Sequence, residues 1–168
     1  APDWSSIPNS NISIVTFNYD RSLDHYLLQA AINSFGKSED ECRQQLSGVP
    51  IVHVYGSLGD LDPSSPNYRP YNTELNPDAI NIAAAAIKVI PETRDNDPAF
   101  DRAFQLLNES EVICFLGFGY NGLNMKRLRI DDVFARAKTE GRRLSLTGTS
   151  VAMLGPARNH LNSRFPGA

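Results

Sequence analysis

Apolar residues along the chain follow two alternating patterns, short β-branched runs and stretches with helical spacing. The short runs predict strands at residues 12–16, 51–55, 111–118 and 142–147. Helical spacing predicts helices between these strands, together with a last helix over about 151–161. Strands that alternate with helices imply right-handed crossovers. We therefore expect an α/β fold, with a Rossmann-like parallel sheet and helices on both of its faces.

Capping signals mark several helix ends. Ser38 and Glu41 have the spacing of a capping box. An Asx-Pro pair starts a helix at 76–77 and again at 97–98, and Pro91 is expected to end the first of these two helices. A long helical stretch from about 122 to 138 is expected to break near Ile130. The first helix of the chain should bury Leu23, Tyr26, Leu27, Ala30 and Ala31. The helix that starts at 76–77 should bury Ala79, Ile82, Ala83, Ala86, Ile87 and Ile90.

Composition is that of a globular protein. The 168 residues are 41% hydrophobic and 21% charged, and no apolar run reaches the length of a membrane span. Strand 111–118 is continuously apolar, which predicts burial on both faces and a core position for Cys114. The only other cysteine is Cys42, so neither a disulfide framework nor a zinc ribbon is expected. We expect a reducing cytoplasm and no metal site.

Charge is distributed unevenly. The net charge is −3, but residues 1–110 hold fifteen acids and seven Lys or Arg, a net of −8. Residues 111–168 hold four acids and nine Lys or Arg, a net of +5. The basic part could meet the phosphates of a dinucleotide or of a nucleic acid, or could consist of solvated helix faces. The overall negative charge disfavours nucleic acid.

Thr16, Asn18 and Asp20 occupy alternate positions where the first strand leads into the first helix. Polar groups at the carboxyl end of a parallel strand are where open α/β sheets bind ligands. In the local alternative, Asp20 or Ser22 caps the helix and Asn18 shapes the turn. Capping explains one of these residues but not the whole Thr-x-Asn-x-Asp run, so we predict a ligand site.

Two further segments carry candidate chemistry. Gly117–Gly122 matches GxGxxG between a strand and a helix, where bare backbone can approach a pyrophosphate; the alternative is a Gly-rich turn required for tight packing. The second strand ends in His53-Val-Tyr55-Gly56-Ser57. The long loop over 57–77 that follows carries Tyr68, Arg69 and Tyr71, which could form a lid or belong to an ordinary surface loop.

The runs TFNYD, HVYGSLG and EVICFLGFGYNGLNMKRL, in this order, resemble the bacterial sirtuin-like branch of the sirtuin superfamily. The resemblance spans about residues 12–161 and implies binding of NAD, with cleavage of the nicotinamide–ribose bond in the intact protein. It implies that Asn18 positions water or ribose and that Asp20 holds the ribose. The catalytic residues that we infer are Asn18, Asp20 and His53. The cofactor-binding residues that we infer are Thr16, Tyr55, Gly56, Ser57, Gly117, Phe118, Gly119 and Asn121.

Three departures from the family pattern bear on this prediction. Tyr55 stands where the family carries its catalytic His, and tyrosine, with an ordinary pKa near ~10, is a poor base at neutral pH. His53 lies two residues earlier on the same strand face, displaced by about 6.6 Å, and could equally be a core residue. The family's GAGxS loop and zinc ribbon are both missing. We therefore expect residues 1–11 to be a polar lead-in and 12–168 to be a single domain that lacks its N-terminal Gly-rich strand-loop.

Three hypotheses follow. The first is an NAD hydrolase-type domain of a bacterial defence protein, with further domains or a homo-oligomer as partners. The second is a degenerate module that binds NAD or ADP-ribose without turnover, which Tyr55 and the missing Gly-rich loop favour. The third is a scaffold that binds nothing, in which Phe17 and Phe118 fill the nucleotide space.

Overall fold

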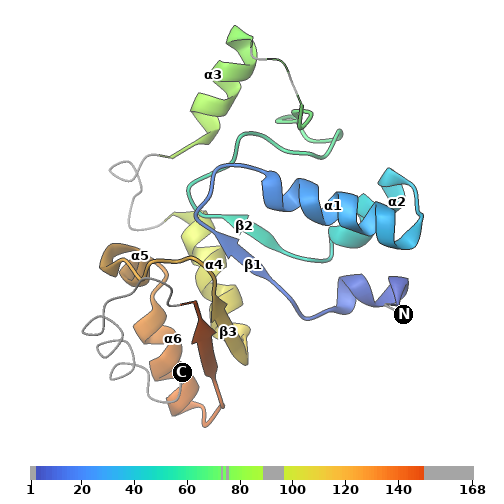
Figure 1. The fold of residues 1–168 in the computed structure, drawn as a ribbon. Helices are drawn as coiled ribbons and strands as arrows, with labels where there is room; N and C mark the ends of the chain where they lie inside the picture. Colours follow the sequence, from blue (N-terminus) through green and yellow to red (C-terminus); the bar gives the residue numbers. More distant parts are fainter. Residues whose placement is uncertain (1–2, 73, 75, 89–96, 150–168) are drawn as a thin grey trace. The chain divides into compact units, whose positions relative to one another are not determined.

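The computed structural model describes residues 3–72, 74, 76–88 and 97–149. The helix predicted over 151–161 lies outside these residues. The chain divides into two compact units, Ala1–Ala99 and Phe100–Ala168, where the sequence predicts a single domain over 12–168. Figure 1 shows the elements of both units. No helix of the described residues is both long enough and apolar enough to cross a bilayer.

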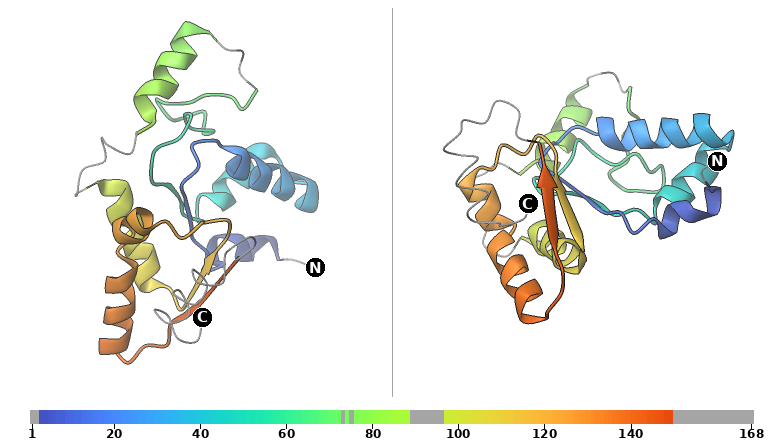
Figure 2. Two further views of the ribbon diagram at one scale, coloured as in Figure 1. Left: turned by 60° about the vertical axis from the view of Figure 1, so that its left-hand side comes forward. Right: turned by 60° about the horizontal axis from the view of Figure 1, so that its bottom comes forward.

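A pair of parallel strands organises the first unit. Strand β1 (Ile14–Thr16) pairs with β2 (Ile51–His53) so that Thr16 lies opposite His53. Helices α1 (Ser22–Phe35) and α2 (Glu39–Leu46) connect the two strands and lie side by side in Figures 1 and 2. The predicted strand–helix–strand connection is confirmed, and its parallel pairing follows from the helical crossover.

Helix α1 packs with a rotation that differs from the prediction. Leu28 and Ala31 are its buried residues, whereas Tyr26 is 68% exposed, so the prediction that Tyr26 belongs to the core is wrong. The reason is that α1 packs against α2, where Leu28 and Ala31 form a core cluster with Cys42. The partly buried residues around this cluster are Trp4, Ile32, Phe35 and Leu46.

The segment predicted as a polar lead-in contains regular structure. Residues Trp4–Asn9 form a 3-10 helix, η1, whose first turn is capped by the Asp3 side chain. The Trp4 ring lies 5.0 Å from the Phe35 ring of α1, so this segment contributes to the core. The capping box of α2 is confirmed, because Ser38 and Glu41 bond reciprocally across the first turn.

Helix α3 (Pro77–Ala86) starts as predicted, with the Asn76 side chain accepting a 2.8 Å hydrogen bond from the Ala79 N–H. The prediction that this helix ends at Pro91 is wrong, because the backbone becomes extended already at Ile87. The Lys88 N–H then donates to the Tyr55 carbonyl at 2.8 Å, which draws the chain out of the helix. Ala79 and Ala83 are buried, but Ile82 is 44% exposed, so the predicted apolar face is only partly correct.

The second unit repeats the strand–helix–strand order. Its elements are α4 (Pro98–Glu109), β3 (Val112–Phe115), α5 (Gly122–Arg127), α6 (Ile130–Thr139) and β4 (Ser145–Gly148). Strands β3 and β4 are parallel. The predicted break near Ile130 is confirmed: Arg129, with a φ of 54°, separates α5 from α6. The core of this unit includes Leu128, Ile130 and Val133.

Strand β3 is not buried on both faces. Ile113 and Phe115 are buried, whereas Val112 and Cys114 are exposed. Successive side chains of a strand point to opposite faces, and the described elements of this unit cover only one of them. The predictions of two-sided burial and of a core position for Cys114 are therefore wrong.

The α/β alternation and the parallel pairing agree with the sequence pattern. The described strands, however, form two separate two-stranded sheets, β1–β2 and β3–β4, rather than one sheet of four. The carboxyl ends of β1 and β2 carry most of the residues that the sequence singles out in the first unit.

Candidate functional site

Asn18 lies just beyond the carboxyl end of β1, with its backbone fixed on both sides. Its N–H donates to the Thr16 hydroxyl at 3.1 Å, and its carbonyl oxygen lies 2.8 Å from Nδ1 of His53 on β2. Its side chain is exposed and makes no hydrogen bond to the described residues. The structure therefore holds the Asn18 backbone in place while the amide remains open to a ligand.

His53 is held between this carbonyl and a carboxylate. Its Nε2 atom lies 3.1 Å from Oδ2 and 3.4 Å from Oδ1 of Asp24, in the first turn of α1. A carbonyl oxygen can only accept a hydrogen bond, so Nδ1 carries a proton, and the carboxylate on the other side favours a proton on Nε2 as well. The acceptors on both sides of the ring therefore favour the doubly protonated, imidazolium form of His53.

Several effects act on the pKa of His53. Burial is the largest and lowers it, but the hydrogen bonds to Asp24 and to the Asn18 carbonyl, with the charges of Asp24 and Asp20, together outweigh burial. The net result is a pKa raised above the ordinary value. Because both ring nitrogens face acceptors, the ring presents no free basic nitrogen to a substrate in this arrangement.

Asp20 is exposed next to the start of α1, and it has a local role. Its Oδ1 accepts the Ser22 N–H at 3.0 Å, which is the helix-start contact predicted as the local alternative. The hydrogen bonds from the Ser22 side chain and backbone, with the charge of His53, lower the pKa of Asp20, so the group is ionised at neutral pH. The formal N-cap of α1 is Arg21, which makes no side-chain capping bond.

Tyr55, Gly56 and Ser57 form the turn that follows β2. Tyr55 is only 3% exposed and meets the Phe17 ring edge-on, with 5.6 Å between ring centroids. Gly56 has a φ of 82°, and a side chain there would begin 1.9 Å from the Ala86 carbonyl oxygen. The Ser57 hydroxyl donates to the Gly59 carbonyl at 3.2 Å. This turn is closely packed. The Ala86 carbonyl at the end of α3 leaves no room for a side chain at Gly56, so a glycine is required there.

Arg21 anchors the loop that the sequence marks as a candidate lid. Arg21 is 6% exposed, and its guanidinium group donates to the carbonyl oxygens of Arg69 and, at 3.2 Å, Pro70. The Tyr71 ring stacks on His25 of α1 with 3.9 Å between centroids, and its hydroxyl lies 3.2 Å from the Ser22 hydroxyl. The loop is thus tied to the first two turns of α1, whereas Tyr68 remains exposed.

The Gly-rich segment of the second unit has two glycines with positive φ, 61° at Gly117 and 67° at Gly119. A side chain at either position would meet no atom within 4 Å, so backbone conformation and not crowding requires these glycines. The Gly117 N–H donates to the Thr149 hydroxyl at 2.8 Å. Asn121 accepts from the Leu123 and Asn124 N–H groups and caps α5. Phe118, the remaining predicted residue, stacks on Phe115 of β3 at 4.8 Å.

The structure therefore brings Thr16, Asn18, Asp20 and His53 together at one strand end. Tyr55, Gly56 and Ser57 lie in the adjoining turn, and the predicted residues of Gly117–Asn121 belong to the other unit. Within the described ranges, no group of three or more His, Cys, Asp or Glu side chains is close enough to hold a metal ion.

Two residues at this strand end were missed from the sequence, Asp24 and Arg21. Asp24 looks like an ordinary acid in the first turn of a helix, where the helix dipole favours a negative charge. Arg21 looks like an ordinary solvated cation. Only the packing of β2 and of the loop against α1 gives them partners.

Comparisons with protein-family models, with curated proteins and with solved structures give no match.

Proposed function

We propose that this chain binds NAD or an ADP-ribose-like nucleotide at the carboxyl end of β1, as part of a Rossmann-like fold, and does so without turnover. The observation that carries the proposal is Asn18, whose backbone is fixed by Thr16 and His53 while its side-chain amide stays open. Ligands of open α/β sheets bind at this edge, beyond the carboxyl ends of parallel strands.

The exposed groups suit the sugar part of such a ligand. The Asn18 amide can both donate and accept, and the ionised Asp20 carboxylate can accept from a ribose hydroxyl. The sirtuin-like resemblance assigns the same two residues to the ribose.

The surroundings of His53 and Tyr55 favour binding over hydrolysis. A general base needs an open, unprotonated nitrogen within reach of the substrate, and both nitrogens of His53 already face acceptors. Tyr55, at the position of the family's His, is buried against Phe17. Hydrolysis of NAD is the second candidate function, supported by Asn18 as a residue able to position water, and it requires Asp24 to release His53.

Calorimetric titration with NAD, ADP-ribose and nicotinamide tests the binding. We expect the first two to bind, and Asn18→Ala to weaken them about tenfold, since a lost hydrogen bond costs ~1 kcal/mol or somewhat more. Asn81→Ala, a change of an exposed Asn on α3, is the matched control and should bind as the wild type does. Failure of both nucleotides to bind, or equal losses in the two variants, would contradict the proposal.

Released nicotinamide, measured after incubation with NAD, distinguishes the two candidate functions. We expect no release above the uncatalysed background. Turnover that His53→Ala abolishes while NAD binding persists would instead establish the hydrolase, with His53 acting as the base.

A further inference from the structure

Tyr71 and His25 form a stacked pair of rings, the aromatic pair, beside the proposed nucleotide site. The two ring centroids are 3.9 Å apart, and the ring planes differ by 5°. His25 lies on α1, three residues after Ser22, and Tyr71 belongs to the loop over 57–77. One face of the Tyr71 ring is used in the pair, but Tyr71 is still 39% exposed. The pair therefore presents part of an aromatic side chain to solvent.

Ser22 connects the aromatic pair to the residues that the nucleotide proposal uses. Its N–H donates to Oδ1 of Asp20 at 3.0 Å, and its hydroxyl lies 3.2 Å from the Tyr71 hydroxyl. Asp20 and Tyr71 therefore contact the same residue. The base of a nucleoside is joined directly to C1′ of its ribose, so a ribose that donates to Asp20 can place its ring on Tyr71.

Contacts within the protein hold Tyr71 in position. The Arg21 guanidinium donates to the carbonyl oxygens of Arg69 and Pro70, the two residues that precede Tyr71. The Tyr71 ring itself rests on His25. A side chain that is already ordered loses little conformational entropy when a ligand binds, so the stacking of a ligand ring contributes nearly in full to affinity.

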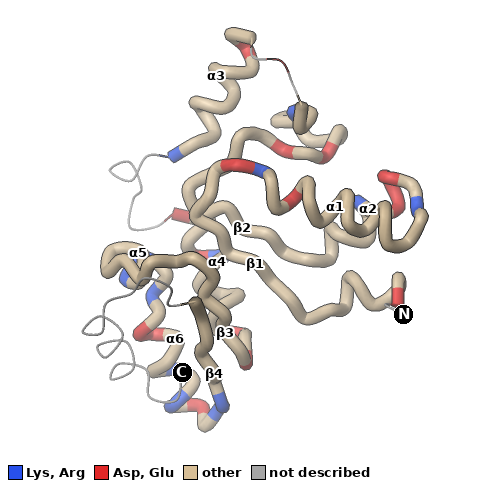
Figure 3. Tube along the Cα trace, in the orientation of Figure 1, with Lys and Arg blue, Asp and Glu red and all other residues tan. Residues whose placement is uncertain are grey.

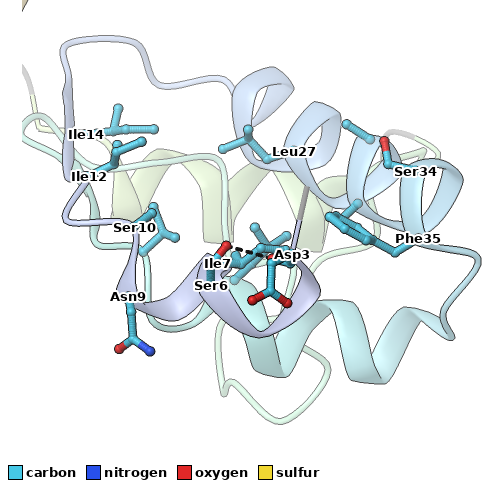
Figure 4. Close-up of a pocket in the computed structure, with 14 residues that line it drawn as sticks. Asp3, Ser6, Ile7, Asn9, Ser10, Ile12, Ile14, Leu27, Ser34 and Phe35 are labelled. Carbon is cyan, nitrogen blue, oxygen red and sulfur yellow. Dashed lines mark hydrogen bonds between the residues drawn. The ribbon is translucent and has the colours of Figure 1, made fainter. Parts of the chain in front are cut away.

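The apolar groove of the first unit is less suited to a base (Figure 4). It has a volume of about 510 Å³ and is lined by residues of η1, α1 and the segment that leads into β1. Phe35 is the only aromatic residue that lines it. Ile12 and Ile14 line it at the amino-terminal end of β1, whereas the residues proposed to bind ribose follow the carboxyl end. We therefore place the base at the aromatic pair and not in the groove.

We propose that the aromatic pair is a stacking platform for a nucleotide base, whose ring lies on Tyr71 while its ribose bonds to Asn18 and Asp20. Planar heterocycles stack on aromatic side chains through their π-faces, so the platform accepts the nicotinamide or the adenine ring. This inference rests on the proposed nucleotide site and adds its ligand class, a nucleotide that keeps its base rather than a sugar phosphate.

Calorimetric titration of the full chain with nicotinamide mononucleotide and with AMP tests the platform, because each ligand carries one ribose and one ring. We expect Tyr71→Leu to weaken binding of the nucleotide whose ring stacks by about tenfold or more. The ligand with the larger loss identifies the ring. Tyr71→Phe keeps an aromatic ring and should bind as the wild type does. Tyr68→Leu is the matched control, because Tyr68 lies in the same loop and is also 39% exposed.

Fluorescence separates stacking on Tyr71 from a role of this residue in holding the loop. Trp4 is the only tryptophan of the chain, so the wild type provides the background signal. In Tyr71→Trp, a ligand ring that stacks on the new indole should quench its emission. In Tyr68→Trp the emission should be unchanged by the same ligand.

Far-UV circular dichroism establishes that each variant is folded. Nucleotide binding that Asn18→Ala weakens, but that Tyr71→Leu affects no more than Tyr68→Leu, would overturn the platform and keep the nucleotide site. Equal losses in Tyr71→Leu and Tyr71→Phe, or binding without quenching in Tyr71→Trp, would also overturn the platform. Failure of every nucleotide, NAD included, to bind the wild type would overturn the nucleotide site itself and the platform with it.

Discussion

Gly56 illustrates how one backbone position joins two distant segments. The chain leaves β2 through this residue with a φ of 82°, and the carbonyl at the end of α3 occupies the space of a side chain. The Tyr55 carbonyl next to it accepts the Lys88 N–H. A glycine that the resemblance assigns to nucleotide binding is thus also required by packing.

Comparing Gly56→Ala with Gly36→Ala separates crowding from backbone strain. Gly36 has a φ of 61° and open space around it, so its substitution should cost about 1–2 kcal/mol from the left-handed conformation alone. Gly56→Ala adds a clash with the Ala86 carbonyl and should cost clearly more. Urea denaturation of both variants measures the free energy of unfolding. Equal losses would show that α3 moves freely away from the turn.

His53 predicts a pH dependence of stability. Its pKa in the folded protein is raised above the unfolded value of 6.5, so its contribution is fully present below that pH and is lost as pH rises through the folded pKa. The free energy of unfolding should therefore fall from pH 6.5 upward, and His53→Gln should remove this part of the slope. Urea denaturation across this pH range measures the effect.

His25→Gln provides the matched control for that experiment. His25 is also a histidine of the first unit, on α1, but it stacks on Tyr71 and lies outside the Asp24 contact. Its replacement should leave the His53-dependent slope in place. If His25→Gln removed the slope and His53→Gln preserved it, the prediction for His53 would be contradicted.

The residues of the strand end were partly predictable. Thr16, Asn18 and Asp20 could be selected because polar groups interrupt an apolar pattern where a strand leads into a helix. Asp24 could not, because its role depends on β2, whose His53 is 29 positions away in the sequence. A histidine on a strand has no assigned partner until the pairing register is known.

At the scale of elements, Arg21 holds the 60–71 part of the loop against α1. Arg21→Ala would leave the Arg69 and Pro70 carbonyls without their donor and release the loop. We expect faster amide hydrogen exchange at Asp60 and Arg69, whose N–H groups bond within the loop. Arg102→Ala, an exposed arginine on α4, should leave these rates unchanged. Unchanged exchange in Arg21→Ala would show that Tyr71 and Ser22 suffice to hold the loop.

Helix starts were predicted better than helix ends or buried faces. Ser38, Asn76 and Asp97 cap through contacts with residues two to three positions away, which the local sequence contains. The end of α3 depends on a bond to Tyr55, more than thirty positions earlier in the chain. The buried face of α1 depends on Cys42 and Trp4, so spacing alone placed Tyr26 incorrectly.

At the scale of the molecule, much of the positive charge of the second unit has a structural partner. Figure 3 shows the basic residues along α5 and α6. The guanidinium carbons of Arg129 and Arg136 lie 3.9 and 5.2 Å from the centre of the Phe104 ring. Arg142 donates to the carbonyls of Asn108 and Ser110. These contacts give Arg129, Arg136 and Arg142 partners within the unit.

The sequence by itself determined the local features of this protein: the four described strands to within a few residues at each end, most of the helix starts, the break at Arg129 and the polar run that follows β1. These depend on residues within a few positions of one another. Only the tertiary structure decided that the described strands form two pairs, that His53 is enclosed between Asn18 and Asp24, and that Arg21 and Gly56 join distant segments. Such contacts depend on which surfaces meet, and a pattern along one dimension does not contain that information.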